Sequence, residues 1–271
     1  MIIDPFHEDD ESYILYLLEV HKRISNSELC QALDLSTSTV RKKLAAMESQ
    51  GLLIRTHGGA ASVDADRDET VAKKLHTNNP QKKAIAAAAA RFLEEGTTLS
   101  FGSGTTILEL SSFLIKLKTT VILTDSTMLA SRIVSNLSLE VHINNGIVRG
   151  RTGCVVGPGS DLLFRSCHTD KAFIGCDSFS LESGACSSNI LVGQVERCML
   201  ECAKERYILC DSTKLNQDSL YSCMGPDGIT ALITDNEANP EYIERLRASG
   251  LTVILAPVPD FLQRRPGIFN N

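Results

Sequence analysis

The sequence lacks the features that mark membrane, secreted and metal-binding proteins. No stretch of its 271 residues approaches 18 consecutive apolar residues, and the N-terminus lacks a basic segment followed by an apolar one. The nine cysteines are odd in number and contain no C-x-x-C pair, which argues against a zinc site. We therefore expect a soluble, cytoplasmic protein with neither a metal nor a cofactor.

The chain also lacks an overall positive charge, since 27 Lys and Arg face 33 Asp and Glu. This balance alone argues against a nucleic-acid-binding protein. The charge is unevenly distributed, however. Residues 20 to 62 contain six Lys or Arg and three acids, a local net charge of about +3. The length suits two domains, and the N-terminal one is basic.

The basic segment has the pattern of a winged helix-turn-helix. Apolar residues from Ile14 to Leu18 predict a first helix, and Ser25 with Glu28 forms a capping box that opens a second helix over 28–33. A third helix is expected to start at Ser36 or Thr37, with an apolar face of Val40, Leu44 and Met47. The Gly58–Gly59 pair then bounds a hairpin, the predicted wing.

The third helix carries hydroxyls and cations on its other face. Short hydroxyl side chains suit base edges or nearby phosphates, and Lys and Arg suit phosphates and guanines. The candidate DNA-binding residues are Ser36, Thr37, Ser38, Thr39, Arg41, Lys42, Lys43, Arg55 and His57. The alternative is a solvated basic face on an ordinary three-helix bundle.

Beyond the basic segment the sequence predicts a linker over 64–81 and an α/β domain over 82–257, followed by a tail over 258–271. Short apolar strands alternate with amphipathic segments, which predicts a largely parallel sheet. The expected strands are 98–101, 121–124, 141–143, 171–174, 207–210, 231–234 and 253–256. Ligands of such sheets bind at the carboxyl ends of the strands.

One strand end carries a glycine-rich turn that could cradle a phosphate. Backbone N–H groups and hydroxyls at a helix start favour an anion, and acids and a lysine follow two further strands. The candidate effector-binding residues are Gly102, Ser103, Gly104, Thr105, Thr106, Asp177, Asp211 and Lys214. The turn could instead be only a tight connection, and the Asp and Lys a surface pair; the turn is not a P-loop.

Residues 11 to 63 resemble the N-terminal domain of the DeoR family of bacterial transcriptional regulators. The family pattern is roughly S-x-x-T-I/V-R-R-D-L, followed by L-E-x-x-G-L-L/I-x-R-x-H-G-G-A. The chain follows it from Ser36 to Leu44 and from Met47 to Ala60, except that Lys43 stands where the family has an acid. The resemblance implies a DNA-binding domain of residues 8–63.

Residues 82 to 257 resemble the effector domain of the same family, which is similar in fold to ribose-5-phosphate isomerase. The matching segments are 83–86, 102–106, 124–126, 145–146, 170–175, 195–199 and 211–214. The resemblance implies a repressor of a carbohydrate-use operon, controlled by a phosphorylated sugar or a related metabolite. A two-fold-symmetric operator would require a homo-oligomer, at least a dimer.

The chain departs from the family pattern at several positions of the effector domain. Gly102 replaces an Asp, Asp125 an Asn, Asn145 a Gly and Val192 a Glu. These changes remove two carboxylates from the expected sugar site. Two alternatives therefore remain: a C-terminal domain that only oligomerises, and a sugar-phosphate isomerase fused to a DNA-binding domain. An isomerase needs a general base, and the helix position expected to supply it is Val192.

Overall fold

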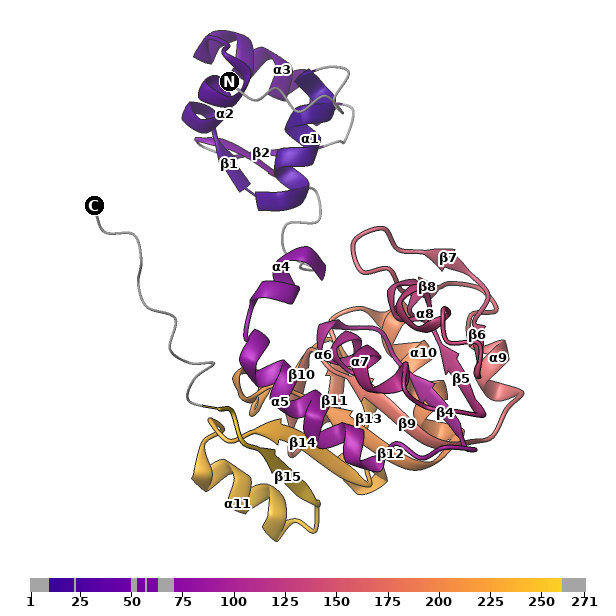
Figure 1. The fold of residues 1–271 in the computed structure, drawn as a ribbon. Coiled ribbons are helices and arrows are strands. Elements are labelled where there is room, and N and C mark those ends of the chain that lie inside the picture. The colour runs from indigo at the N-terminus through magenta and orange to yellow at the C-terminus, as the bar shows by residue number, and fades with distance from the viewer. Residues whose placement is uncertain (1–9, 22, 50–52, 57, 63–70, 260–271) are drawn as a thin grey trace. The chain divides into compact units, whose positions relative to one another are not determined.

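The computed structural model describes residues 10–21, 23–49, 53–56, 58–62 and 71–259 (Figure 1). The chain divides after Lys73 into two compact units. His57, residues 64–70 of the expected linker and residues 260–271 of the expected tail lie outside the described residues.

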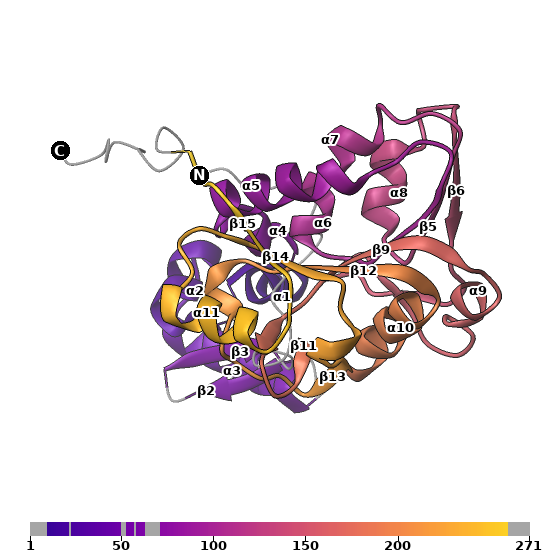
Figure 2. The same ribbon diagram turned by 90° about the horizontal axis from the view of Figure 1, so that it is seen from below.

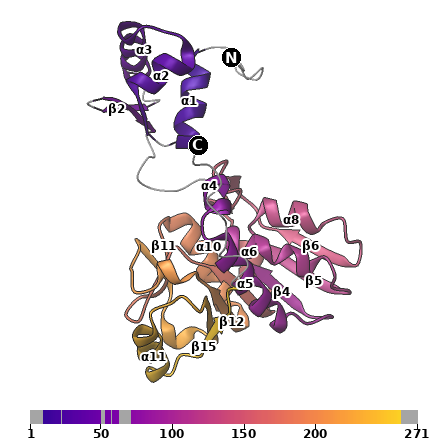
Figure 3. The same ribbon diagram turned by 60° about the vertical axis from the view of Figure 1, so that its left-hand side comes forward.

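The N-terminal unit contains three helices and a small antiparallel sheet with strand order β1-β3-β2 (Figure 3). Its elements are α1 (Asp10–His21), β1 (Arg23–Ser25), α2 (Asn26–Leu33), α3 (Thr37–Ser49), β2 (Leu53–Thr56) and β3 (Gly59–Ser62). Val40, Leu44 and Met47 are buried against Ile14 and Leu29, as the helical spacing predicted. This arrangement confirms the winged helix-turn-helix.

The predicted capping box is present at the start of α2. The Glu28 N–H donates to Ser25 Oγ at 3.2 Å, and the Ser25 N–H donates to Glu28 Oε2 at 2.8 Å. The helix begins at Asn26, two residues earlier than predicted, because Ser25 itself is the cap. Asp34 ends the helix in the left-handed conformation, with φ 56°.

The wing depends on a close approach of two strands. Gly59 in β3 pairs with Ser25 in β1, and a Cβ at Gly59 would lie 2.0 Å from the backbone oxygen of Ile24. Only glycine fits this contact without a shift of the backbone. The sequence did not predict β1, because three residues between two helices are too short to show an alternating pattern.

The C-terminal unit is built on a seven-stranded sheet in which all paired strands are parallel, in the order β15-β14-β12-β9-β4-β5-β6. The strands are β4 (Thr98–Phe101), β5 (Thr120–Thr124), β6 (Leu139–Ile143), β9 (Thr169–Gly175), β12 (Ala203–Leu209), β14 (Ala231–Asp235) and β15 (Val253–Ala256). Each overlaps one of the predicted strands, so the predicted α/β class is confirmed.

Helices cover both faces of this sheet (Figure 2). One face carries α5 (Asn79–Ala89), α6 (Thr105–Glu109), α7 (Ser111–Leu114) and α8 (Thr127–Ile133). The other carries α9 (Leu162–Arg165), α10 (Ile190–Glu201) and α11 (Pro240–Ala248). Because both faces are covered, the carboxyl-terminal halves of the central strands β9 and β12 are apolar, which made them visible as short apolar segments.

Two smaller pairings were not predicted. An antiparallel sheet joins β10 (Ser178–Ser180), β11 (Gly184–Ser187) and β13 (Tyr221–Met224), and a hairpin joins β7 (Ile147–Val148) to β8 (Val155–Val156). Serine, glycine and cysteine dominate β10 and β11, so neither has the alternating pattern of a strand. β10 pairs with β11 in a short hairpin, and β11 in turn pairs with the distant β13.

Part of the range predicted as a linker is helical. Helix α4 (Val71–His76) and the first turn of α5 fall within residues 64–81. The Lys82 ammonium stabilises the end of α4, since it donates to the backbone oxygen of Thr77 at 2.6 Å and to that of Lys74. Pro80 in the first turn of α5 fits a helix start.

Candidate DNA-binding surface and effector site

The exposed face of α3 carries four of the predicted DNA contacts. Thr37, Ser38, Arg41 and Lys42 are exposed, and neither cation forms an ion pair with any other described residue. Ser38 and Lys42 lie four residues apart on the side away from the buried Val40 and Leu44, and Thr37 and Arg41 lie four residues apart between that side and the apolar face. This surface has the free donors and positive charge that a DNA duplex requires.

Ser36 and Thr39 are engaged within the helix start. Ser36 Oγ accepts the Thr39 N–H at 3.2 Å and lies 2.8 Å from Thr39 Oγ1 and 2.9 Å from Ser38 Oγ. Ser36 is therefore the N-cap, one of the two candidates that the sequence offered. The Ser36 hydroxyl therefore caps the helix, and Thr37 and Ser38 are the exposed hydroxyl residues of the first turn.

Two predicted DNA-contacting cations make ion pairs within the N-terminal unit. Lys43 Nζ lies 3.2 Å from Asp10 Oδ2 in α1. Arg55 Nη1 lies 3.8 Å from Glu48 Oε2, and the Arg55 N–H donates to Glu48 Oε1 at 2.9 Å. Both pairs are partly exposed, so each contributes little to stability, and each gives its cation an acidic partner within the N-terminal unit.

The sheet reverses its strand order between the adjacent strands β4 and β9. From β4 the chain proceeds to β5 and β6 on one side, whereas β9 leads to β12, β14 and β15 on the other. The predicted glycine-rich turn follows β4, and Asp177 follows β9, so both lie at this reversal point. Open α/β sheets bind ligands at such a point.

The glycine-rich turn is compact and its hydroxyl residues are buried. Ser103, Thr105 and Thr106 are each less than one-tenth exposed, and Gly104 has a φ of 125°, which favours glycine. Helix α6 begins directly after this glycine at Thr105. The turn therefore presents backbone N–H groups and hydroxyls in a small space.

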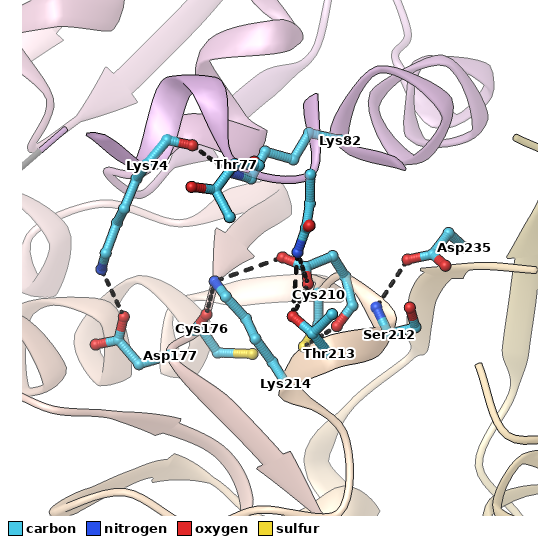
Figure 4. A network of polar contacts seen from close by, with 12 residues as sticks. Lys74, Thr77, Lys82, Cys176, Asp177, Cys210, Ser212, Thr213, Lys214 and Asp235 are labelled. Carbon is cyan, nitrogen blue, oxygen red and sulfur yellow. Dashed lines mark hydrogen bonds and ion pairs between the residues drawn. The ribbon is translucent and has the colours of Figure 1, made fainter. Parts of the chain in front are cut away.

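Asp177 is held by Lys74, as Figure 4 shows, and by Ser188. Lys74 Nζ lies 3.1 Å from its Oδ1, and the Ser188 N–H and hydroxyl donate to its Oδ2 at 2.9 Å and 2.6 Å. Burial opposes the charge, but Lys74 and the Ser188 donors outweigh it and hold the pKa of Asp177 well below its usual range. Asp177 is thus an ionised acceptor.

Asp211 and Lys214 form the second part of this polar network, and Figure 4 shows Lys214 with its hydrogen bond to Cys176. Asp211 accepts a hydrogen bond from Asn78 Nδ2 at 3.0 Å and another from the Thr213 hydroxyl. Lys214 donates to the backbone oxygen of Cys176 at 2.7 Å and lies 4.0 Å from Asp211 Oδ2. Burial opposes the charge of Lys214, but surrounding acids and thiols raise its pKa.

Lys82 was not predicted as a site residue, because a lysine in an Ala-rich helix does not by itself indicate burial or binding. Lys82 is only 4% exposed, and its pKa is lowered to about 8 by burial and by the charge of Lys214. Lys74 and Asn78 thus bring two donors from the helical connection onto the strand ends, and Lys82 binds the backbone oxygens of that connection.

The two positions that lack the expected carboxylates have acids beside them. Phe101 pairs with Thr124, so Gly102 and Asp125 are the next residues on the neighbouring strands β4 and β5. Val192 and Glu196 are one turn apart on α10, and both are buried. Asp125 was visible in the sequence as a departure from the family pattern. Glu196 was not predicted as a site residue, although its spacing of four residues from Val192 indicates that both lie on one face of the helix.

Glu196 is in a setting that favours its neutral form. It is 4% exposed and accepts a hydrogen bond from the Cys223 thiol at 3.5 Å. Burial and the charges of Asp125 and Asp177 raise its pKa well above the ordinary value. Val192 itself packs with Cys154 and Val156 and offers no titratable group.

Among the described residues no three His, Cys, Asp or Glu side chains gather as metal ligands. None of the described helices has the length and apolar character to span a bilayer. All nine cysteines are free thiols.

A winged helix-turn-helix with an exposed basic helix, joined to an α/β unit with a polar site at its strand ends, defines a ligand-sensing DNA-binding protein. The matches to protein families agree. Residues 11–66 match the DeoR-like helix-turn-helix domain, and residues 77–236 match the DeoR C terminal sensor domain. The chain belongs to the DeoR family of transcriptional regulators.

Similar proteins span nearly the whole chain. The HTH-type transcriptional regulator GlpR of Haloferax volcanii is 30% identical over 85% of this chain and 90% of its own length. The lactose phosphotransferase system repressor of Lactococcus lactis is 30% identical, with 89% and 95% covered. The putative aga operon transcriptional repressor of Escherichia coli O157:H7 is 27% identical, with 89% and 91% covered.

Among solved structures, ribose 5 phosphate isomerase A from Neisseria gonorrhoeae aligns with 49% of this chain and 52% of its own, at a TM-score of 0.38 and 14% identity.

Proposed function

We propose that this protein is a repressor of a carbohydrate-metabolism operon and that a phosphorylated sugar or derivative sets its affinity for operator DNA. The names of the lactose phosphotransferase system and aga operon repressors support this class of target. One observation in the structure carries the proposal. The two acids of the effector site, Asp177 and Asp211, already bind Lys74 and Asn78 from the segment that leads to the DNA-binding unit.

This arrangement lets a bound effector act directly on the segment that leads to the DNA-binding unit. A ligand whose hydroxyls bind Asp177 or Asp211 must compete with Lys74 or Asn78 for the same oxygens. A phosphate in the turn at Gly102–Thr106 adds negative charge near Lys214. Binding therefore rearranges the segment around α4, where the chain passes from one unit to the other. A two-fold operator would place the regulator on DNA as at least a dimer.

The site does not favour the alternative of an isomerase. The helix position that would supply the general base is Val192, and the nearest acid on that face, Glu196, has a raised pKa and a thiol donor. We propose that the C-terminal unit binds its ligand without converting it. Incubation of the full chain with ribose 5-phosphate, followed by assay for a ketose phosphate, tests this directly.

For DNA binding we propose direct contacts by Thr37, Ser38, Arg41 and Lys42, with Ser36, Thr39, Lys43 and Arg55 maintaining the helix and the wing. Neutralising one phosphate-contacting cation removes about 0.9 from the slope of log affinity against log salt. The double variant Arg41→Ala with Lys42→Ala is expected to flatten that slope by up to about 1.8. Mobility-shift titration on the promoter upstream of the protein's own gene measures it.

The matched control is Lys116→Ala with Lys118→Ala, two exposed lysines of the C-terminal unit, which removes the same charge elsewhere. This variant should keep the parental salt slope. An unchanged slope in the Arg41 and Lys42 variant would rule out the proposed DNA-binding face.

For the effector we propose that the turn at Gly102–Thr106 holds the phosphate. Thr105→Val keeps the shape and removes a hydroxyl donor, and hydrogen bonds to charged groups contribute about 1.5–3 kcal/mol. We expect affinity for a phosphorylated sugar to fall about tenfold or more. Calorimetry with hexose and pentose phosphates, and with the free sugars as references, measures this.

Thr98→Val is the control, because Thr98 is at the opposite end of the same strand β4. It should bind as the parent does. A free sugar that binds as tightly as its phosphate, or a Thr105→Val protein with parental affinity, contradicts the phosphate cradle.

A further inference from the structure

Asp125 is a buried acid without a cationic partner among the described residues. It follows β5 at the carboxyl edge of the sheet and is 0% exposed. Neither of its carboxyl oxygens forms a hydrogen bond with another described residue. Buried polar atoms in folded proteins are almost always hydrogen-bonded, so an orphaned carboxyl group requires an explanation.

The surroundings of Asp125 leave its charge uncompensated. Burial raises its pKa to about 7, and its own backbone N–H and the Ser103 side chain only partly oppose this. The titratable groups that interact with it are the Cys154 thiol before β8 and the Glu196 carboxyl on α10, and neither can supply a positive charge. Lys74, by contrast, pairs with Asp177.

The position of Asp125 connects it to the phosphate cradle. It is adjacent in register to Gly102, the first residue of the glycine-rich turn, and its carboxyl group is near Ser103 in the same turn. No carboxylate can come from residue 102, and a Cβ there would already meet Ile174 Cδ1 at 3.0 Å. Asp125 is therefore the acid next to the cradle.

We infer that Asp125 contacts the effector and determines specificity, by accepting a hydrogen bond from a hydroxyl or ammonium group on the organic part of a phosphorylated ligand. The cradle holds the phosphate, and Asp125 selects ligands that carry a donor at the right distance from it. Since Asp125 is fully buried without ligand, this contact requires the side chains around Ser103 to move on binding. The inference rests on the proposed function.

The test compares an organic phosphate with inorganic phosphate, because only the former can reach Asp125. Calorimetry on the full chain uses hexose 6-phosphates, a pentose 5-phosphate, a hexosamine 6-phosphate and inorganic phosphate as probes. Asp125→Asn is expected to weaken the tightest organic probe about tenfold or more while inorganic phosphate changes less than about twofold. Between pH 6 and pH 8 the ratio of the two affinities should rise more in the parent than in the variant, because the ionised carboxylate is the stronger acceptor and the titration of the phosphate probes is common to both proteins.

Asp170→Asn is the control, because it neutralises an acid that pairs with Lys204 at the opposite end of β9. Both affinities should match those of the parent. Asp125→Ser provides a second, smaller replacement if the Asn variant fails to fold. A folded Asp125 variant that binds the organic probe with parental affinity overturns the inference and leaves the proposed function standing. A parent that binds no phosphate-containing probe overturns both.

Discussion

The Asp125→Asn variant is expected to be more stable than the parent at neutral and alkaline pH, by up to about 4 kcal/mol. The pKa of Asp125 is raised from 3.8 to about 7, a shift of roughly three units at about 1.4 kcal/mol each. A raised pKa means that the folded state binds the proton more tightly than the unfolded state. The parent therefore loses stability as the pH rises from about 4 to about 7, and the variant does not.

Urea unfolding of both proteins at pH 5, 6, 7 and 8 measures this difference, which should grow with pH and level off above pH 7. Removal of the Asp125 charge should also lower the pKa of Glu196, which that charge raises, so Glu196 adds a contribution of the same sign to the difference. The pKa of Asp170 is lowered by its hydrogen bonds to Lys204 and to the Thr98 N–H. Asp170→Asn should therefore reduce stability above pH 4, the opposite sign. A stability difference for Asp125→Asn that is absent or constant with pH contradicts the isolated buried charge.

A variant that is more stable but binds its effector more weakly would have the thermodynamic behaviour of a functional residue. Proteins retain uncompensated buried groups where a ligand completes their hydrogen bonding. The two measurements on Asp125 are independent, because the urea experiment contains no ligand. A variant with higher stability and weaker effector binding would show that Asp125 binds the ligand, whereas higher stability alone would show only that its buried charge is unfavourable.

The second large effect is expected from the connection between the two units. In the parent, a saturating effector should change operator affinity by about 5–150-fold, the usual range of allosteric coupling. The variant Lys74→Ala with Asn78→Ala lacks the side chains that compete for Asp177 and Asp211. We expect it to bind the effector more tightly and to show a ratio of operator affinities near one. Mobility-shift titration at fixed salt, with and without the tightest phosphorylated probe, measures the ratio.

Lys83→Ala is the control for this experiment, since Lys83 is an exposed lysine on α5 close to Lys82. It should keep the parental ratio. Because coupling is reciprocal, operator DNA must change the effector affinity of the parent by the same factor. A parental ratio near one with a ligand that binds would favour the alternative in which the C-terminal unit only oligomerises. If the Lys74 and Asn78 variant keeps the parental ratio of operator affinities, this segment does not transmit effector binding to the DNA-binding unit.

Local sequence patterns were sufficient to predict much of the fold. The capping box at Ser25, the apolar face of α3 and the seven apolar strands each depend on a few neighbouring residues, so the sequence predicted them and the structure confirms them. Short elements with no periodicity, such as β10 and β11, escaped prediction because three or four residues, most of them small or polar, show no alternating pattern, and β11 pairs with β13, a strand distant in the sequence.

Side-chain partners distant in the sequence were beyond prediction. The sequence treated Lys43 as one more cation of the DNA-binding face, but its distance to Asp10 depends on how α1 packs against α3. Likewise, residues 64–81 lack an apolar period, and nothing local indicated that Lys74 and Asn78 bind acids roughly a hundred residues later in the chain.

The sequence by itself determined that this protein has a basic winged helix-turn-helix and a parallel α/β domain with a glycine-rich turn, because helical spacing, caps and buried strands are local properties. Only the tertiary structure decided how the acids of the site are used. Strand register sets Asp125 beside Gly102, and packing of the connection sets Lys74 against Asp177. Burial, hydrogen bonding and charge at those acids depend on which distant elements meet, which no local pattern specifies.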